Sequence, residues 1–366
     1  MKKAGLGLTA LLAALLFVVA CDGSPSARDG SGRRLDDGGV TEDGRAALEA
    51  GGPHDSASGP WDARAALDLL GDGPRRDGAA PRDGSPGPAP DSRSQPTGDA
   101  GALCVGSTPA AVFVQKVTEL PDYTQTDSAY GGFANGGNYH CGPTAVSNSL
   151  VWLADHGHPG LMAHSSDRKK DQHDLIATLG SATYLATSAQ GYGTPPSNLL
   201  PGLKRYLQDK GVAYRSLKWQ GWSPIPIGAE FDTGVALPSL DWIKLGIQGR
   251  NVAWLLIAMG THDPQTDVHR IANGHWLTVV GHGTTGSTSD PRYLVVHDPW
   301  TGGSVTHAYV QTERLGGGTL TVDPQLLPGG LTRSAAGYYR LRGPFSFSQP
   351  EVLLLGAVVL ELPCTP

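Results

Sequence analysis

The spacing of apolar side chains predicts helices in the first part of the folded region and strands in the rest. Residues 143–155 carry Val146, Leu150 and Leu153 at helical spacing, behind a proline whose missing N–H costs nothing at a helix start. The predicted helices are 143–155, 167–179 and 196–210. β-Branched and aromatic runs predict strands at 252–259, 276–281, 293–297, 304–310, 338–341 and 352–362. Helices followed by antiparallel strands are typical of an α+β domain.

The first 21 residues have the character of a secretory signal. Lys2 and Lys3 precede an uncharged run of 17 residues. A transmembrane helix needs about 20 residues, so this run is short for one. The run ends in a small residue before Cys21, which resembles the lipobox of bacterial lipoproteins, so Cys21 is the expected lipid attachment site. An ordinary signal peptide with an incidental cysteine, or an uncleaved anchor, is the alternative. Each version predicts export; the lipobox predicts a membrane-anchored lipoprotein that faces the periplasm or the cell exterior.

Residues 22–100 lack the composition of a folded domain. They hold 15 Gly and 9 Pro among 79 residues, with 15 acidic side chains, 9 Arg and no Lys, which predicts a disordered tether. Residues 101–366 then form a single folded domain, long enough to bury one large core. Of the formal net charge of −6, only −2 falls on this domain. Without a basic stripe, nucleic acid is not an expected partner.

Cys141 is the cysteine best placed for catalysis. It stands at the start of a predicted helix after a glycine-rich approach, where unpaired N–H groups and the helix dipole stabilise a thiolate and lower the thiol pKa. Cys104 and Cys364 lie near the two ends of the folded domain and can pair in an oxidising compartment. Cys141 is then the odd thiol, a candidate nucleophile. The alternative is a buried, inert cysteine.

A thiolate nucleophile needs a general base and a group that orients this base. His275 begins one apolar strand, and Asp298 ends the next. A hairpin between the two strands would place the carboxylate beside the imidazole, where it fixes the tautomer through Nδ1. His282 and His297 are out of phase with this pair and are weaker candidates for the base, while His140 is expected to be structural.

Several of these motifs together resemble the family thirty-nine-like cysteine peptidases of the papain superfamily, over roughly residues 114–300. The matching elements are Gln125, Cys141-Gly142-Pro143-Thr144-Ala145, Gly274-His275-Trp276 and His297-Asp298-Pro299-Trp300. The resemblance implies a papain-like α+β fold and peptidase activity. It also implies that Gln125 donates a hydrogen bond to the oxyanion, together with the backbone N–H of Cys141. Cys141 lies sixteen positions after Gln125, a longer spacing than in the family, so Asn135 and Asn138 stay alternative donors.

The function expected from these residues is hydrolysis of peptide bonds through a Cys–His–Asp triad and a thioacyl-enzyme. We expect a monomer that acts on a peptide or protein substrate without a cofactor. An acyltransferase or peptidoglycan amide hydrolase would use the same acyl-enzyme, and an inactive binding module would keep only the fold. Residues 262–269 are predicted to form a loop that holds two His and two Asp, which are ligands that metal ions take. Their spacing matches no standard metal motif, so chance is the preferred explanation and no metal is assigned. Residues 185–250, with three Trp, have no assigned counterpart.

Overall fold

The computed structural model describes residues 107–187, 193–223, 225–300, 307–322, 330–345, 347 and 349–363. These residues belong to one compact unit. The predicted signal peptide (1–21), the tether (22–100) and the cysteines Cys21, Cys104 and Cys364 lie outside the described residues, so the lipid attachment and the disulfide stay predictions. Over the described ranges, no helix has both the length and the apolar composition needed to cross a membrane.

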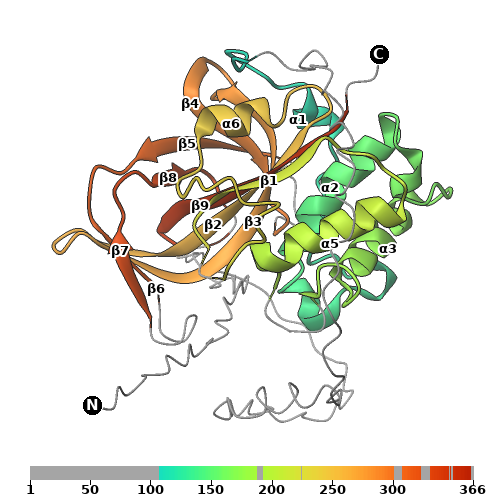
Figure 1. Cartoon of the computed structure of the whole chain (residues 1–366), viewed down its shortest axis with the longest axis horizontal. Coiled ribbons are helices and arrows are strands. Elements are labelled where there is room, and N and C mark those ends of the chain that lie inside the picture. Colours follow the sequence, from blue (N-terminus) through green and yellow to red (C-terminus); the bar gives the residue numbers. More distant parts are fainter. Residues whose placement is uncertain are drawn as a thin grey trace, which may run out of the picture. The chain divides into compact units, whose positions relative to one another are not determined.

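Most helices of the described residues come before the strands. Their bounds are α1 Lys116–Glu119, η2 Ala129–Gly131, η3 Ala134–Gly137, α2 Cys141–Asp155, η4 Pro159–Leu161, α3 Arg168–Gly180, α5 Pro196–Asp209 and α6 Leu240–Leu245. Helix α3 begins after Asp167, whose carboxylate accepts a hydrogen bond from the Lys170 N–H at 3.0 Å and so caps the helix. Helices α2, α3 and α5 lie together on one side of the strands (Figure 1).

The strands of the described residues form one sheet that closes on itself. Their bounds are β1 Ser216–Gly221, β2 Val252–Asp263, β3 Val268–Thr284, β4 Ser289–His297, β5 Ala308–Arg314, β6 Thr319–Val322, β7 Leu331–Ser334, β8 Tyr339–Arg342 and β9 Glu351–Glu361. Strands β2, β3, β4, β5, β8 and β9 make a ring in which every neighbouring pair is antiparallel. Strand β1 pairs with β9, β6 pairs with β3 in parallel, and β7 pairs with β6.

The predicted papain-like α+β class is wrong. The described residues form a closed six-stranded antiparallel barrel with extra strands and few helices, so the fold is mostly β. Apolar runs indicate strands but carry no information about their partners: β9 pairs with both β2 and β8, and these pairings close the ring. Strands β2 and β3 are also longer than predicted, because they continue through residues whose polar character indicated a loop.

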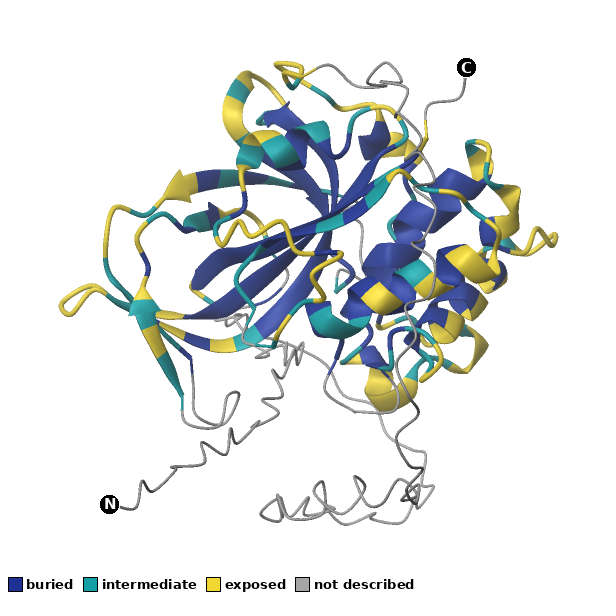
Figure 2. Cartoon of the chain, viewed as in Figure 1, coloured by how far each residue is buried: buried dark blue, intermediate teal, exposed yellow. Residues whose placement is uncertain are grey.

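Side chains of β2 are buried on both faces, which explains its uninterrupted apolar sequence. Trp254 and Leu256 pack in the cluster that joins the strands to α2 and α5. The alternate residues Leu255 and Ile257 pack in a second cluster with side chains of β4, β9 and α6, as the period of two in a strand requires. Figure 2 shows this burial along the strands and over most of α2.

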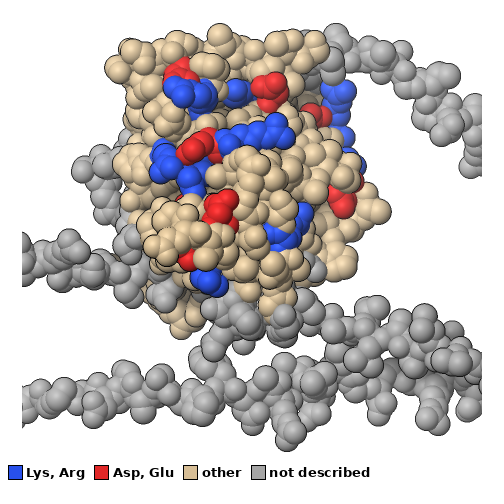
Figure 3. Space-filling view, turned by 90° about the vertical axis from the view of Figure 1, so that its left-hand side faces the viewer, with Lys and Arg blue, Asp and Glu red and all other residues tan. Residues whose placement is uncertain are grey.

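The described part of the segment 185–250 contributes side chains to the core. Trp219 on β1 is fully buried and packs edge-on against Trp276 of β3, with ring centroids 6.4 Å apart. Trp222 and Trp242 are partly buried against the two clusters. Basic and acidic side chains are interspersed on the face of the molecule that Figure 3 shows.

Candidate active site

Cys141 is the first residue of α2 and has no exposed surface. Its sulfur is a thiol and is not part of a disulfide. The turn before it is closed by a hydrogen bond from the His140 N–H to the Gly137 carbonyl, at 2.8 Å. The next residue, Gly142, has no space for a side chain, because a Cβ there would lie 2.8 Å from the Cβ of Thr194. Local packing therefore fixes the helix start that carries the thiol.

His275 lies on β3 and is held by a buried carboxylate. Its Nε2 is 2.7 Å from Oδ1 of Asp298, and the two side chains are 1% and 3% exposed. Asp298 follows the last residue of β4, and its Oδ1 also accepts a hydrogen bond from the Trp300 N–H at 2.9 Å. The prediction that Asp298 bonds Nδ1 is wrong in this detail: the carboxylate approaches from the Nε2 side, which leaves Nδ1 for the sulfur.

His275 and Cys141 interact by a hydrogen bond and by their charges. Burial alone would lower the pKa of the His275 imidazolium. The charge and hydrogen bond of Asp298, with those of Cys141, outweigh burial and raise this pKa to about 10. The structure thus brings Cys141, His275 and Asp298 together, and the environment favours a protonated imidazole.

Gln125 is buried and links the two loops that border this group. Its Nε2 donates a hydrogen bond to the Gly137 carbonyl at 2.8 Å, four residues before Cys141. Its backbone N–H donates to the Pro299 carbonyl at 2.8 Å, just after Asp298. Because the Gly137 carbonyl can only accept a hydrogen bond, the end of the Gln125 side chain that faces it must be the NH₂ group. The NH₂ group, and not the side-chain oxygen, therefore points toward the turn before Cys141.

Asn135 and Asn138, the alternative donors, have a different setting. Both are exposed and lie in or next to the turn η3. Asn135 has a φ of 54°, the left-handed conformation that asparagine tolerates better than most residues. These features are those of turn residues.

The other histidines weighed above, His140, His282 and His297, are buried. Burial lowers the pKa of His140, of His282 and of His297 to about 4 in each case. Their rings are therefore neutral at pH 7. His140 stacks on Phe133 at 5.0 Å between ring centroids, and Nδ1 of His297 lies 3.3 Å from the Pro121 carbonyl.

Asp122 interacts with the triad through the charge of Asp298, although no sequence motif selected it. Its Oδ1 is buried and has no hydrogen-bond partner in the described residues. Burial, and then the charge of Asp298, raise its pKa to about 8. The available signal was its position three residues before Gln125, but the proximity to Asp298 arises from long-range contacts.

Described residues from two other segments close over the triad. Thr194 lies against Gly142 and accepts a hydrogen bond on its carbonyl from Trp276 Nε1, at 2.7 Å. Phe347 packs edge-on against His275, with ring centroids 5.8 Å apart. A substrate can reach the sulfur only after part of this cover moves.

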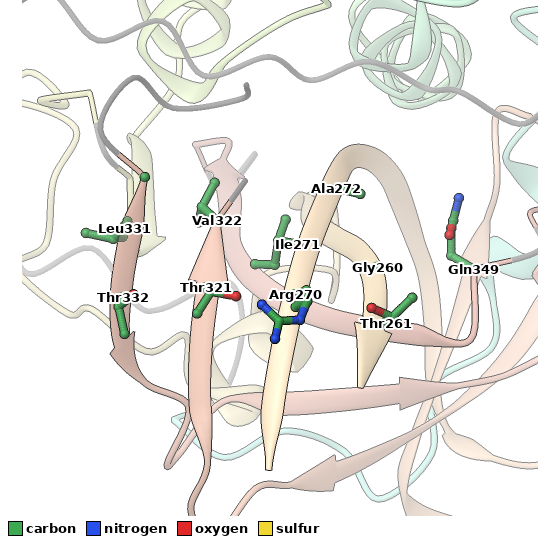
Figure 4. Close-up of a pocket in the computed structure, with 11 residues that line it drawn as sticks. Gly260, Thr261, Arg270, Ile271, Ala272, Thr321, Val322, Leu331, Thr332 and Gln349 are labelled. Atoms are coloured by element: carbon green, nitrogen blue, oxygen red, sulfur yellow. The ribbon is translucent and has the colours of Figure 1, made fainter. Parts of the chain in front are cut away.

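A cavity of about 690 Å³ lies between β2, β3, β6 and β7 (Figure 4). Arg270, Ile271 and Ala272 of β3 line it, together with Thr321 and Leu331 from the added strands. The triad residues are not part of its lining. The cavity is nevertheless close to the triad along β3, because His275 comes three residues after Ala272 on this strand.

The predicted loop 262–269 is in fact the end of the β2–β3 hairpin. His262, Asp267 and His269 have their ligating atoms within 4.8 Å of one another, which is a grouping able to hold a metal ion.

Comparison with models of known families gave no match for the chain, and comparison with curated proteins gave none either.

Proposed function

We propose that the chain is a cysteine peptidase that hydrolyses peptide bonds through Cys141, His275 and Asp298. The observation that carries this proposal is the sulfur at a helix start next to an imidazole that a buried carboxylate holds at 2.7 Å. A nucleophile, a base and an orienting group in this order are the requirement of covalent acyl transfer. The proposal rests on the site and not on the fold, since one chemistry recurs on unrelated folds.

The first half-reaction forms a thioester. Sγ of Cys141 attacks the carbonyl carbon of the scissile amide, and the oxygen becomes an oxyanion. Nδ1 of the His275 imidazolium then gives its proton to the leaving nitrogen, so the C–N bond breaks and an amine departs. The raised pKa of His275 keeps this proton available at neutral pH.

The second half-reaction releases the acid. His275, now neutral, takes a proton from a water molecule, which attacks the thioester and restores the thiolate and the imidazolium. Asp298 stays ionised and holds the ring through both halves. One Nε2 hydrogen of Gln125 is bonded to the Gly137 carbonyl, and the second one is donated to the oxyanion.

The resemblance to the family thirty-nine-like peptidases supports a peptide or protein as the substrate. The lipobox-like Cys21 supports an exported lipoprotein, anchored by lipid to a membrane, with residues 22–100 as a tether. A monomer suffices for the chemistry, because one chain supplies all three triad residues.

The test is peptide cleavage by the purified chain, followed by mass spectrometry, with and without an added amine acceptor. New peptide ends without amine incorporation are expected, whereas incorporation would indicate an acyltransferase. Cys141→Ser should abolish cleavage. The matched control is Ser149→Ala on the same helix, because the Ser149 hydroxyl is buried without a hydrogen-bond partner in the described residues and its removal leaves no group unpaired. Cleavage that persists in Cys141→Ser would overturn the proposal.

A further inference from the structure

The end of the β2–β3 hairpin brings three ligand-type side chains to one point. His262 and His269 face each other directly across the two strands, and their rings stack with centroids 4.3 Å apart. Oδ1 of Asp267 lies 2.9 Å from Nε2 of His262 and 3.7 Å from Nε2 of His269. Ligands of a tetrahedral zinc ion lie about 3.3 Å apart, given bonds of about 2.0 to 2.1 Å, so the ligating atoms, which lie within 4.8 Å of one another, must move closer, and the stacked rings must tilt toward a common point.

His269 supplies an independent observation that points to a ligand. It is 1% exposed, and its Nδ1 lies 2.7 Å from Oε1 of Glu351. A carboxylate only accepts, so Nδ1 carries a proton, and in the neutral ring Nε2 carries the lone pair that a metal ion needs. This buried Nε2 has no hydrogen-bond partner in the described residues, although a buried acceptor left unpaired is costly. It is aimed at the space beside Asp267 and His262.

Glu351 and His269 have the arrangement that surrounds many metal sites. A ligating histidine commonly donates its other N–H to a carboxylate, which fixes the tautomer and makes the ring a better ligand. Glu351 is in turn held by Arg340, whose Nε lies 3.0 Å from Oε2. The outer partners of a metal site are therefore already in place.

We propose that His262, Asp267 and His269 bind a divalent transition-metal ion of the zinc class. Two imidazoles favour such an ion over Ca²⁺ or Mg²⁺, which prefer oxygen ligands. Three protein ligands leave one coordination position for water. The Asp267 side chain is 58% exposed, so the ion enters directly from solvent.

Arg340 sets the main cost of binding. Its Nη2 lies 3.4 Å from Nδ1 of His262, so in the metal-free chain Nδ1 accepts and Nε2–H donates to Asp267. Metal on Nε2 requires the proton on Nδ1, and the contact with Arg340 must be given up. Its length is beyond the usual range of strong N–H hydrogen bonds, and the charge of Arg340 stays compensated by Glu351.

The bound ion would join the two strands at their far end. All three ligands come from the eight residues 262–269, and Glu351 and Arg340 tie them to β9 and β8. Strand β3 then runs from His269 to His275. The expected effect of the metal is thus on the stability of the hairpin, and the peptidase chemistry proposed above does not depend on it.

The test uses the full chain, stripped with a chelator and titrated with Zn²⁺ and with Co²⁺ by calorimetry and absorption spectroscopy. One ion per chain is expected, and Co²⁺ should give tetrahedral d–d bands without the sulfur-to-cobalt band that binding at a cysteine would give. His262→Ala and Asp267→Asn should abolish binding, and both residues are partly exposed, so the chain should still fold. Glu351→Gln should weaken binding by about 10- to 100-fold.

Asp263→Asn is the matched control, since Asp263 lies in the same hairpin but its carboxylate is bonded to Gln265 N–H and Thr266. It should leave the affinity unchanged. The proposal is overturned if the wild type binds no ion, if His262→Ala or Asp267→Asn binds as tightly as the wild type, or if the cobalt spectrum shows a sulfur ligand. A peptidase that stays active without metal would leave both proposals standing, and an inactive chain that still binds metal would refute only the peptidase.

Discussion

Asp298→Asn removes the charge beside His275 and keeps the shape of the side chain. A unit-charge pair with 2.7 Å between its atoms is stabilised by about 6 kcal/mol at an effective dielectric constant of about 20, equivalent to about four pKa units. This interaction is what outweighs burial and raises the pKa of His275 to about 10. Without it, burial remains, and the pKa of His275 should fall below its ordinary value of 6.5. At pH 7 the imidazole should then be neutral, and the thiolate should lose its partner.

The assay is the rate of alkylation of Cys141 by iodoacetamide as a function of pH, with the adduct located by mass spectrometry. In the wild type the midpoint should lie well below the roughly 8.5 of an ordinary thiol. In Asp298→Asn it should rise by at least about one pH unit, which lowers the rate about tenfold at pH values below both midpoints. Asp241→Asn, an exposed carboxylate on α6, is the control. An unchanged midpoint in Asp298→Asn would show that this carboxylate is not coupled to the thiol.

Three further variants test other parts of the site. Gln125→Ala should lower kcat for peptide cleavage by about 10²- to 10³-fold with little change in KM, because an oxyanion donor acts in the transition state. A loss of substrate affinity as large as the loss of kcat would contradict this role. Asp122 keeps its proton in the folded chain up to pH about 8, whereas the unfolded chain releases it near pH 4. Its stabilising contribution is therefore full below about pH 4 and lost as pH rises through 8. Asp122→Asn should raise the free energy of unfolding at pH 9 relative to the wild type and change it little at pH 4, as measured by urea denaturation; parallel pH profiles would refute the raised pKa. Phe347→Ala should open the cover and speed alkylation of Cys141 several-fold at constant pH, and an unchanged rate would mean that the ring does not limit access.

The residues of the triad could be selected from the sequence because each stands at a local signal. A helix start marks Cys141, the start of an apolar run marks His275, and the end of β4 marks Asp298. Contrary to expectation, His275 does not begin its strand but lies in the middle of β3, which starts at Val268. The nitrogen that Asp298 contacts could not be predicted, since it depends on the side from which the carboxylate approaches the ring. Asp122 could not be selected either. It comes close to Asp298 because the neighbouring Gln125 bonds to Pro299 across the fold, and a contact over that sequence distance leaves no local pattern.

The closed barrel and the hairpin end were beyond prediction for a related reason. A strand buried on both faces, such as β2, shows its apolar character but not its partners, and ring closure depends on β9 meeting both β2 and β8. At the end of the hairpin, polar residues replace apolar ones, and polarity with turn residues is the usual mark of a loop. The ladder nevertheless continues as far as the pair of Asp263 and Val268, because backbone hydrogen bonds do not require apolar side chains.

The two interacting carboxyls of Asp298 and Asp122 acquire different charge states from their surroundings. Asp298 accepts hydrogen bonds from His275 and from the Trp300 N–H, which favour its ionised form. Asp122 has an oxygen without a partner in the described residues, and burial and the charge of Asp298 keep it protonated. Asp122 is protonated at neutral pH, so Asp298 is the carboxylate whose charge acts on His275. Above pH about 8 the ionised Asp122 would place a second negative charge close to Asp298.

The closed cover over the triad affects the same balance. Burial strengthens the attraction between His275 and Asp298, because the local dielectric constant is low, but it also disfavours the isolated imidazolium. In the proposed reaction a substrate must reach the buried Cys141, and any opening that admits water would weaken both effects together. The bound substrate then excludes water again, so the charge of Asp298 matters most in the complex, at the moment when the proton leaves His275 for the amine. Charge removal at Asp298 should consequently lower kcat more than it raises KM.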